Sequence, residues 1–361
     1  MISSSDISQA VTAAATQAGF ELSGIASVRE EDFPELQAFI EWVDSGHAGE
    51  MKYLEKRTDS GTLKRSSVKN AAPWVRSVIV CGLNYNTDKP YSTQVNDPHR
   101  GWISRYAWGS KDYHQALGTR LQQVEGAVHS IASQNNLPIE TRSYVDTGPI
   151  VERVYARYAG LGWIGKNTCL INQKLGSFFF LGVILTSLDL PPDLPAADRC
   201  GSCTRCIDAC PTQAIVAPGK LDSRRCIAYL TIEKRGDIPV EFREPIGHHI
   251  FGCDICQDVC PWNTKAGNAP FTQAPEFQPQ LQSFHPDLVS LAEMDEETFR
   301  QTFRDSPVKR AKYAGLKRNV AVAMGNSGQK EFVPHLEKMA ADGDPVVAEH
   351  ARWAWEKLRF S

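Results

Sequence analysis

Apolar residues recur at both helical and strand spacing over residues 1–190, which predicts a mixed domain. Helical spacing covers residues 6–18, 33–45, 113–135 and 150–159. Gly19 and Gly46 directly follow the first two of these segments and favour a helix end there. Strand-like apolar runs cover residues 77–83, 139–145 and 178–186. We therefore expect residues 1–190 to fold as one domain of the α+β class.

Proline-rich segments divide the rest of the chain. Residues 190–195 favour a linker, and a second such stretch lies near residues 267–286. We therefore expect a second domain over residues 191–285 and a third over residues 286–361. In the third, Ser306-Pro307 and Asp344-Pro345 are the same helix start signal, 38 residues apart. HEAT repeats have a period of about 40 residues, so we predict a HEAT-like helical cap packed on the rest.

Cysteine spacing is the most specific chemical signal in the chain. Four cysteines before Pro211 have the bacterial ferredoxin spacing C-x2-C-x2-C-x3-C-P for [4Fe–4S] clusters: Cys200, Cys203, Cys206 and Cys210. Three more repeat the end of that motif before Pro261: Cys253, Cys256 and Cys260. Ile250 occupies the place of the first cysteine of this second run, and Cys226, between the runs, can supply the missing thiolate.

The eight thiolates suffice for two clusters with four cysteine ligands each. The fourth cysteine of the ferredoxin motif ligates the other cluster of a pair, which predicts crossed ligand sets. One set is Cys200, Cys203, Cys206 and Cys260, and the other is Cys210, Cys226, Cys253 and Cys256. A zinc site needs only four ligands, and disulfide frameworks belong to small secreted domains. The remaining Cys81 and Cys169 have apolar surroundings, so we predict that both are small buried hydrophobes.

The composition permits a large core and places few limits on partners. The 361 residues are 42% hydrophobic, and no apolar run reaches the ~18 residues of a membrane span. The N-terminal segment lacks the basic and apolar stretches of a signal peptide, so we predict a cytoplasmic protein with no membrane partner. The formal net charge of −3 excludes a basic field over the whole molecule.

Basic residues nevertheless gather in two segments. Residues 52–76 contain seven of them, and residues 304–318 contain six against the single acid Asp305. The six are Arg304, Lys309, Arg310, Lys312, Lys317 and Arg318. A solvated face is the ordinary interpretation of either segment, but both permit a phosphate backbone as partner.

A glycine pattern at residues 160–165 resembles the GxGxxG fingerprint of dinucleotide-binding loops. That fingerprint must follow a strand and open a helix. Here it follows the helical pattern of residues 151–159, and Trp163 and Ile164 would crowd a phosphate. We therefore expect a glycine-rich loop whose backbone amides can face a different cofactor.

Several long motifs resemble those of epoxyqueuosine reductases. They are SRYAWG at 104–109 with DYH at 112–114, VDTGP at 145–149, AGLGWIGKN at 159–167, LDSRRCIAYLTIE at 221–233 and FGCDICQDVCPWN at 251–263. The resemblance continues through residues 306–307, 318–321 and 351–354 and so covers most of the chain. Gln213 stands where the family usually has Gly, and Ala228 where it usually has Ser.

The resemblance implies a cobalamin enzyme that reduces epoxyqueuosine to queuosine at the wobble position of tRNAs with GUN anticodons. It implies a nitroreductase-like cobalamin domain, similar to that of reductive dehalogenases, and a ferredoxin-like domain with two [4Fe–4S] clusters. It also implies that Asp146 donates a proton, which near neutral pH requires burial to raise the pKa of its carboxyl. Without the resemblance, Asp146 in Asp-Thr-Gly-Pro would be interpreted as a turn residue.

Further site residues follow from the same resemblance. The expected cobalamin contacts are Arg65, Ser104, Asp146, Gly165, Asn167, Leu170 and Gln257. The expected tRNA contacts are Arg153, Lys166, Lys309, Arg310, Lys317 and Arg318. Electrons would come from a reductant such as flavodoxin or ferredoxin, and we expect a monomer.

Two other functional classes stay open. One is another corrinoid and iron–sulfur reductase that acts on a small substrate, although such a substrate needs no basic helical repeat. The other is a non-catalytic iron–sulfur electron carrier, although a bare ferredoxin needs no α+β domain. Retention of corrinoid absorption bands after desalting would exclude the carrier.

Overall fold

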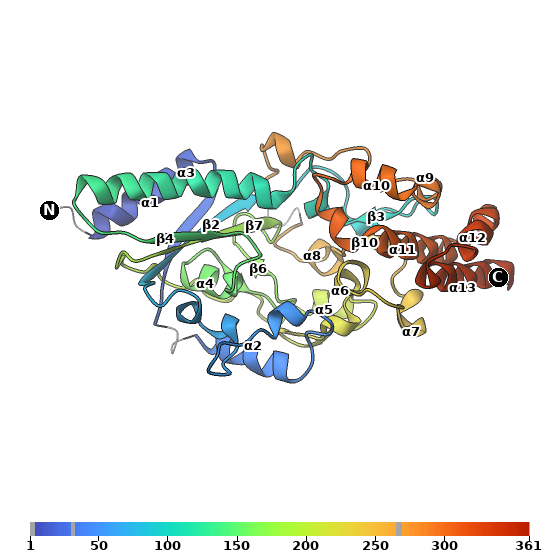
Figure 1. Cartoon of the computed structure of the whole chain (residues 1–361), viewed down its shortest axis with the longest axis horizontal. Coiled ribbons are helices and arrows are strands. Elements are labelled where there is room, and N and C mark those ends of the chain that lie inside the picture. The colour runs from blue at the N-terminus through green and yellow to red at the C-terminus, as the bar shows by residue number, and fades with distance from the viewer. Residues whose placement is uncertain (1–3, 30–32, 265–268, 361) are drawn as a thin grey trace.

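The computed structural model describes residues 4–29, 33–264 and 269–360. Its N-terminal part is built on a four-stranded antiparallel sheet with the order β1–β2–β7–β4 (Figure 1). The strands are β1 (Leu22–Ser27), β2 (Ser77–Asn84), β4 (Thr141–Tyr144) and β7 (Phe179–Thr186). All eight residues of β2 are buried, because this strand is central and both faces of the sheet are covered.

Helices pack on both faces of this sheet. On one face lie α1 (Ser4–Gln17) and α3 (Tyr113–Gln134), and on the other lie α2 (Pro34–Asp44) and α4 (Glu152–Tyr158) (Figure 1). Alternate residues of β2 enter the two cores: Ile79 packs with α1 and α3, and Val80 packs with α4. The predicted helices and three predicted strands are confirmed. Strand β1 was not predicted, because its sequence LSGIAS has only a short apolar core.

The cysteine-rich part consists of short elements joined by loops. They are α5 (Arg205–Asp208), β8 (Ile215–Ala217), β9 (Lys220–Leu221), α6 (Ile227–Ile232), α7 (Val240–Arg243), β10 (His249–Phe251) and α8 (Ile255–Asp258). Strand β10 pairs in parallel with β3 (Trp102–Ile103), which ties this part to the N-terminal part. Residues 267–268, at the start of the predicted second linker, lie outside the described residues.

Short strands and single-turn helices complete the N-terminal part and its connections. Strands β5 (Trp163–Ile164) and β6 (Leu170–Ile171) form a hairpin after α4. The glycine pattern at 160–165 therefore follows a helix and leads into a strand, as expected for a loop that is not a Rossmann fingerprint. The 3-10 turns are Lys52–Leu54, Lys64–Ser66, Val68–Asn70, Ser92–Gln94, Arg105–Ala107, Ser223–Arg225, Pro275–Phe277, Pro307–Ala311 and Lys330–Phe332.

The C-terminal part is helical. Its helices are α9 (Leu288–Glu293), α10 (Glu296–Thr302), α11 (Tyr313–Asn326), α12 (Val333–Ala340) and α13 (Pro345–Phe360). The start signal at Pro345 opens α13 as predicted, with Asp344 accepting from the Val346 amide at 2.8 Å. The signal at Pro307 instead opens a 3-10 turn, and Lys312, at φ 65°, separates this turn from α11. The HEAT-like repeat and the three domain boundaries stay predictions.

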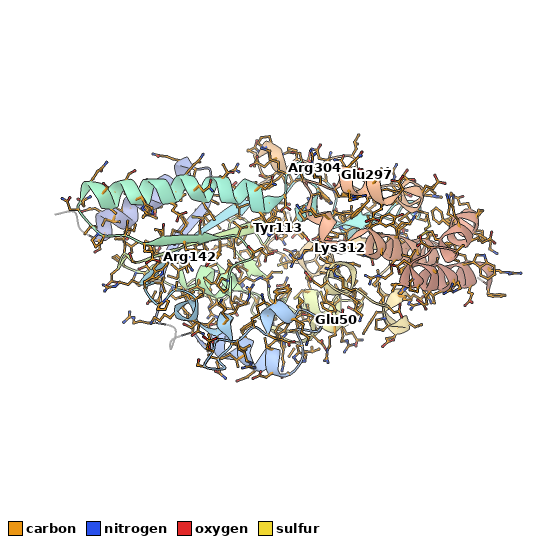
Figure 2. All side chains as sticks on the ribbon, in the orientation of Figure 1. Glu50, Tyr113, Arg142, Glu297, Arg304 and Lys312 are labelled. Atoms are coloured by element: carbon orange, nitrogen blue, oxygen red, sulfur yellow. The ribbon has the colours of Figure 1, made fainter. Side chains whose placement is uncertain are left out.

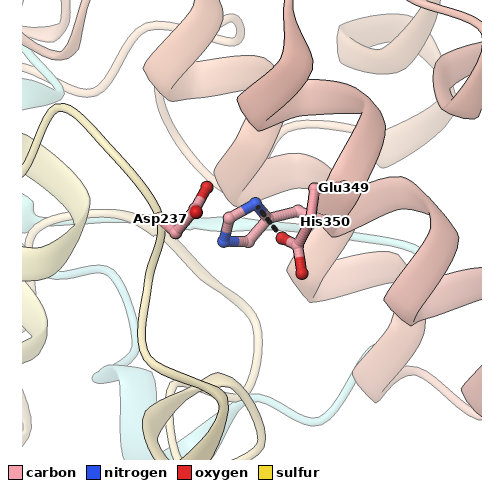
Figure 3. Close-up of side chains that lie close together, drawn as sticks. All are labelled: Asp237, Glu349 and His350. Atoms are coloured by element: carbon pink, nitrogen blue, oxygen red, sulfur yellow. Dashed lines mark ion pairs between the residues drawn. The ribbon is translucent and has the colours of Figure 1, made fainter.

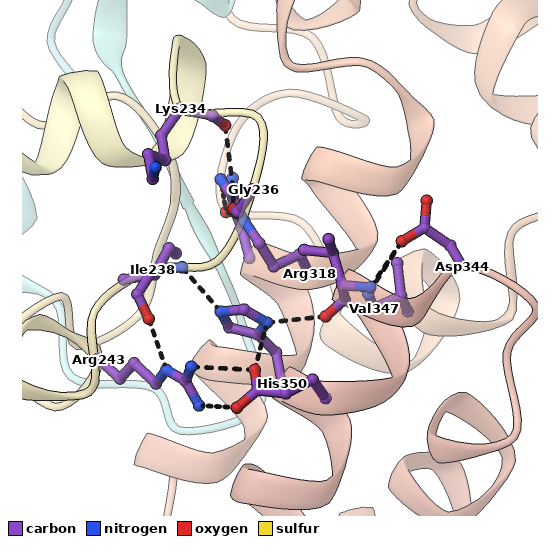
Figure 4. Close-up of polar contacts among 11 residues, drawn as sticks. Lys234, Gly236, Ile238, Arg243, Arg318, Asp344, Val347 and His350 are labelled. Carbon is purple, nitrogen blue, oxygen red and sulfur yellow. Dashed lines mark hydrogen bonds and ion pairs between the residues drawn. The ribbon is translucent and has the colours of Figure 1, made fainter. Parts of the chain in front are cut away.

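A buried polar network fastens α11 to the cysteine-rich part (Figure 4). The Arg318 side chain is fully buried and donates to the carbonyls of Leu230, Lys234 and Gly236 at 2.6, 2.9 and 2.7 Å. Its neighbour Lys317 is 7% exposed and donates to the Ala292 carbonyl. The prediction that Lys317 and Arg318 bind tRNA is therefore wrong, because both cations are enclosed and already used by protein carbonyls.

A second buried group, around His350, fastens α13 to the same segment. The His350 Nε2 atom accepts from the Ile238 amide at 3.0 Å, so Nδ1 carries the proton and donates to the Val346 carbonyl at 2.7 Å. Asp237, Glu349 and His350 lie close together (Figure 3), but both imidazole nitrogens are engaged and Glu349 is bonded to Arg243. This trio therefore joins two parts of the chain. Across the described residues, we find no helix long and apolar enough to cross a bilayer.

Candidate active site and cysteine cavities

Asp146 lies in the loop between β4 and α4, beside the start of α3. Its backbone is left-handed, with φ 57°, a conformation that Asp tolerates better than most residues. Gly148 follows two residues later, where a Cβ atom would meet the Tyr144 ring at 2.5 Å. The tight loop thus turns the Asp146 carboxylate toward α3. Tyr113, in the first turn of α3, lies near the middle of the molecule, between the sheet and the C-terminal helices (Figure 2).

Three side chains converge on the Asp146 carboxylate. The Tyr113 hydroxyl donates to Oδ2 at 2.8 Å, Arg310 Nη1 lies 3.3 Å from it, and His114 Nε2 lies 3.7 Å from it. The other imidazole nitrogen of His114 bonds to Asp112 Oδ1 at 2.7 Å. Because Arg310 belongs to the turn before α11, this site joins the N-terminal and C-terminal parts.

These neighbours determine the protonation of the site. Burial alone would raise the pKa of Asp146, but the nearby imidazole of His114, the hydrogen bond from Tyr113 and the charge of Arg310 together hold it well below its usual range. Burial opposes a charge on His114 too, yet its bonds to Asp112 and Asp146 raise its pKa to about 9. The expectation of a raised pKa for Asp146 is therefore wrong, because these neighbours outweigh the effect of burial. At neutral pH the pair is an imidazolium beside a carboxylate.

Two cavities border this network and share Thr147 and Arg310. The smaller, of about 610 Å³, is lined by Asp146, Glu152 and a group of basic residues: Lys56, Lys64, Arg65 and Arg310. The larger, of about 1010 Å³, is lined by Tyr113 and His114 on one side. On its other side are basic residues of α10 and the loops around the following turn: Arg300, Arg304, Lys309, Arg310 and Lys312. The site is therefore a carboxylate between two open, largely cationic spaces.

The cations around the larger cavity differ in their ion pairs and in their exposure to solvent. Lys309 pairs with Asp112 at 2.9 Å, and Arg310 pairs with Glu233 at 2.8 Å. Arg304 is 81% exposed and, among the residues that the structure describes, its one ion pair is with its neighbour Asp305, while Lys312 is exposed. The exposed pair, and not Lys317 and Arg318, presents positive charge to solvent at this cavity. Figure 2 shows Arg304 at the upper edge of the molecule in this view.

Each predicted cysteine set surrounds a cavity. The first, of about 240 Å³, is lined by Cys200, Cys203, Cys206 and Cys260. The second, of about 190 Å³, is lined by Cys210, Cys226, Cys253 and Cys256. These are the sets of the crossed pairing, and four thiols around a space of this kind fit a [4Fe–4S] cluster with four cysteine ligands.

The surroundings of the two cysteine cavities suit charged sulfur atoms. The Trp163 indole donates to Cys200 Sγ at 3.4 Å, and the Ala214 amide donates to Cys210 Sγ at 3.2 Å. Cys169 also lines the second cavity and is hydrogen-bonded to Cys256. Its prediction as an inert buried hydrophobe is therefore wrong. The same prediction is confirmed for Cys81, where complete burial raises the pKa of the thiol to about 12.

The residues predicted to contact cobalamin fall into three places. Arg65 and Asp146 line the smaller cavity, and Arg65 also donates to the Ile150 carbonyl at 3.0 Å. Asn167 and Gln257 line the second cysteine cavity. The other three line none of the cavities described above. Ser104 is 3% exposed and donates to Asp254, and Gly165 and Leu170 belong to the β5–β6 hairpin.

Two predicted tRNA contacts lie away from Asp146. Lys166 lines the first cysteine cavity, where its ammonium donates to the carbonyls of Gly201 and Cys203 at 2.7 and 2.9 Å. Arg153 lines the second cysteine cavity and donates to the Thr168 carbonyl at 2.9 Å. Each of the two therefore lines a cysteine cavity, and their role as tRNA contacts stays a prediction. Sequence reasoning assigned no role to His114 or Glu152, since nothing in the local sequence marks either side chain as facing the cavities around Asp146.

Comparison of the chain with known proteins identifies its family. Residues 199–263 match the family model described as 4Fe-4S double cluster binding domain, and residues 65–147 match that described as Epoxyqueuosine reductase QueG, DUF1730. The epoxyqueuosine reductase of Xanthomonas campestris is 40% identical over 353 residues, which cover 97% of this chain and 95% of that protein. The chain belongs to the epoxyqueuosine reductase family.

Other epoxyqueuosine reductases extend the comparison. That of Escherichia coli is 37% identical over 338 residues, which cover 93% of this chain and 85% of that protein. A solved epoxyqueuosine reductase with a tRNA-Tyr epoxyqueuosine-modified stem loop has a TM-score of 0.86 and 30% identity, over 98% of this chain and 90% of that chain. The Bacillus subtilis enzyme, solved with a catalytic loop swung out of the active site, has a TM-score of 0.85 and the same identity and coverage.

Proposed function

We propose that this chain reduces the epoxide of epoxyqueuosine to the alkene of queuosine at the wobble position of tRNAs with GUN anticodons. Its membership of the epoxyqueuosine reductase family supports this activity. The observation that carries the proposal in this structure is the Asp146 carboxylate, held between two cationic cavities and bonded to proton-bearing side chains. A related enzyme was solved with a modified tRNA stem loop, and the cationic cavity suits that class of substrate.

The reaction needs electrons, and the two cysteine sets would hold the clusters that deliver them. Conversion of an epoxide to an alkene consumes two electrons and two protons and releases the oxygen as water. Clusters in the two cysteine cavities would pass the electrons inward one at a time. We propose a one-electron carrier such as flavodoxin or ferredoxin as the reductant, and a monomer as the working form.

Cobalamin is the cofactor that this site would use. When bound, it would supply a strongly nucleophilic reduced cobalt for opening the epoxide. The space fits, because the cavities of about 610 and 1010 Å³ meet at Thr147 and Arg310, next to Asp146. Asn167 and Gln257 would offer amide groups to it at the second cysteine cavity, and Arg65 would offer a cation in the smaller cavity. Ser104, Gly165 and Leu170 would shape the wall behind it.

Asp146 would deliver a proton to the oxygen of the opened epoxide. Its carboxylate is ionised at rest, so it must first receive a proton, and His114 holds one at neutral pH within 3.7 Å. We propose that His114 transfers its proton to Asp146, while the hydrogen bond from Tyr113 holds the carboxylate in position. The loop that carries Asp146 has a left-handed residue, and in the related Bacillus subtilis enzyme a catalytic loop is swung out of the active site. Movement of the loop would bring Asp146 to the substrate.

The tRNA would bind over the larger cavity. Arg304 and Lys312 present solvent-exposed positive charge there, and Lys309 and Arg310 pair with Asp112 and Asp146. The wobble base would be splayed out of the anticodon loop into the cavity, as single-stranded RNA recognition generally requires. Phosphate contacts would supply most of the affinity.

The direct test is conversion of a modified stem loop by the purified chain, reconstituted without oxygen with iron, sulfide and cobalamin. The product nucleoside should have lost one oxygen atom by mass spectrometry, and omission of cobalamin should abolish the conversion. Reduction of a halogenated phenol with no conversion of the stem loop would favour a small-substrate reductase. Cluster reduction with no corrinoid retained after desalting would favour an electron carrier. Either result would contradict the proposed function.

A further inference from the structure

The smaller cavity beside Asp146 contains a second carboxyl, that of Glu152. Glu152 is the first residue of α4, and its side chain lines this cavity together with Asp146 and Arg65. Its Oε1 atom is buried and has no hydrogen-bond partner among the described residues. A buried carboxylate oxygen without a donor is costly, and a proton on the carboxyl removes that cost.

The charges that face Glu152 come from three elements. Asp146 repels a charge on it, while Arg65 and its neighbour Arg153 attract one. The same cavity is also lined by Tyr53, Lys56, Lys64 and Arg310. Burial, and after it the charge of Asp146, raise the pKa of Glu152 to about 7 despite the two arginines. The cavity thus contains one carboxylate and one carboxyl that holds a proton near neutral pH.

We propose that Glu152 supplies one of the two protons taken up by the epoxide oxygen, and that Asp146 supplies the other. This inference rests on the proposed function. Both C–O bonds of the epoxide would break, the two electrons of the proposed reductant would leave a C=C bond in their place, and the oxygen would leave as water with the two protons. Of the two carboxyls, Glu152 holds its own proton near neutral pH, whereas Asp146 receives one from His114, so the two protons come from different sides of the cavity system.

The test compares Glu152→Gln with Glu152→Asp and with Glu241→Gln. Glu241 is a matched control, because it is an exposed acid in the first turn of another short helix, α7. Glu152→Gln should lower kcat on the epoxyqueuosine stem loop by roughly 10²–10⁴-fold, the range of general acid catalysis, with KM and the bound corrinoid spectrum unchanged. Glu152→Asp should recover part of the rate, and Glu241→Gln should behave as the parent does.

The pH profile separates this role from a structural one. In the parent, kcat should fall as pH rises through about 7, because Glu152 then loses its proton. That fall should be absent in Glu152→Gln, and the infrared band of a protonated carboxyl that titrates in the parent should be absent as well.

Two results would overturn the inference. One is parent-like kcat in Glu152→Gln across this pH range, and the other is a loss confined to KM or to corrinoid binding. A parent that reduces no stem loop would overturn the proposed function and this inference with it, whereas an active parent with an equally active Glu152→Gln variant overturns the inference alone.

Discussion

Asp146 illustrates how the neighbours of a side chain determine its chemistry. Its carboxylate would be a poor acid by itself, since Tyr113, His114 and Arg310 all favour the ionised form. The same neighbours place a protonated imidazole beside it, which makes proton delivery a property of the pair. The acid is thus distributed over two residues, one from the loop after β4 and one from the start of α3.

Asp146→Asn tests the carboxylate. Asn tolerates the left-handed backbone of this position and keeps the shape of the side chain, but it cannot carry the proton. Turnover should fall roughly 10²–10⁴-fold, while cluster spectra, corrinoid binding and stem-loop affinity stay at parent values. Single-turnover assays give the rate, and a rate near that of the parent would mean that Asp146 is only a turn residue.

Cys226 and Cys169 form a second comparison at the residue scale. Both line the second cysteine cavity, but only Cys226 is needed to complete a set of four. Cys226→Ser should therefore lose one cluster of two, whereas Cys169→Ser should keep both. Iron and sulfide analysis per chain measures the difference. Equal iron in the Cys226 variant and the parent would contradict the crossed sets, and iron loss in the Cys169 variant would make Cys169 a ligand.

At the scale of elements, the segment from α10 to α11 carries two groups of basic side chains, one exposed to solvent and the other buried. The turn before α11 and the end of α10 expose Arg304 and Lys312 beside the larger cavity. One turn further, α11 enters the core, and its Lys317 and Arg318 join it to the cysteine-rich part. The basic segment 304–318 is therefore divided into a solvent-exposed cationic surface and a buried anchor.

Charge reversal of Arg304 and Lys312 to Glu tests the surface. Stem-loop affinity should fall, and the slope of log affinity against log salt should become shallower by roughly 0.7 for each phosphate that the variant no longer neutralises. Reversal of the exposed Arg76 and Arg142 gives a control with the same change in net charge, at the end of the sheet where Ser77 and Thr141 pair with Thr186. Equal affinity of the two variants across a salt titration would place the tRNA elsewhere.

At the scale of the whole molecule, buried polar groups join the parts around the active site. Arg318 and His350 both bond to backbone groups of residues 230–238, and Arg310 crosses from the C-terminal part to Asp146. Because a broken network of this kind leaves buried donors and acceptors unsatisfied, it favours one relative placement of the parts. The placement of the larger cavity depends on it.

His350 should make this junction sensitive to acid. Burial, the largest influence, lowers the pKa of His350 to about 4 in the folded state, against an unfolded value of about 6.5. A lowered histidine pKa means that its stabilisation is present above pH 6.5 and is lost as pH falls toward 4, by on the order of 3 kcal/mol in all. In calorimetry, the melting temperature of the parent should fall more steeply over this range than that of His350→Gln. Parallel curves for the two proteins would contradict this role.

The sequence alone determined what depends on local spacing. The periods of apolar residues predicted the four long helical segments and three sheet strands of residues 1–190, because each period follows from the geometry of one element. The cysteine spacings predicted both sets that surround the two cavities, since in the ferredoxin motif the cysteine before the proline ligates the other cluster of the pair. The long motifs identified the family, which the comparisons confirmed.

Only the tertiary structure decided which charged side chains are buried and which groups surround each of them. Lys312 and Arg318 are both basic residues of one short segment, yet the first is exposed and the second is enclosed by carbonyls from residues 230–236. Asp146 is ionised because α3 and the turn before α11 bring His114 and Arg310 to it across 32 and 164 positions of the chain. Solvation and Coulomb energies depend on distance in space, and the chain positions of these groups do not encode that distance.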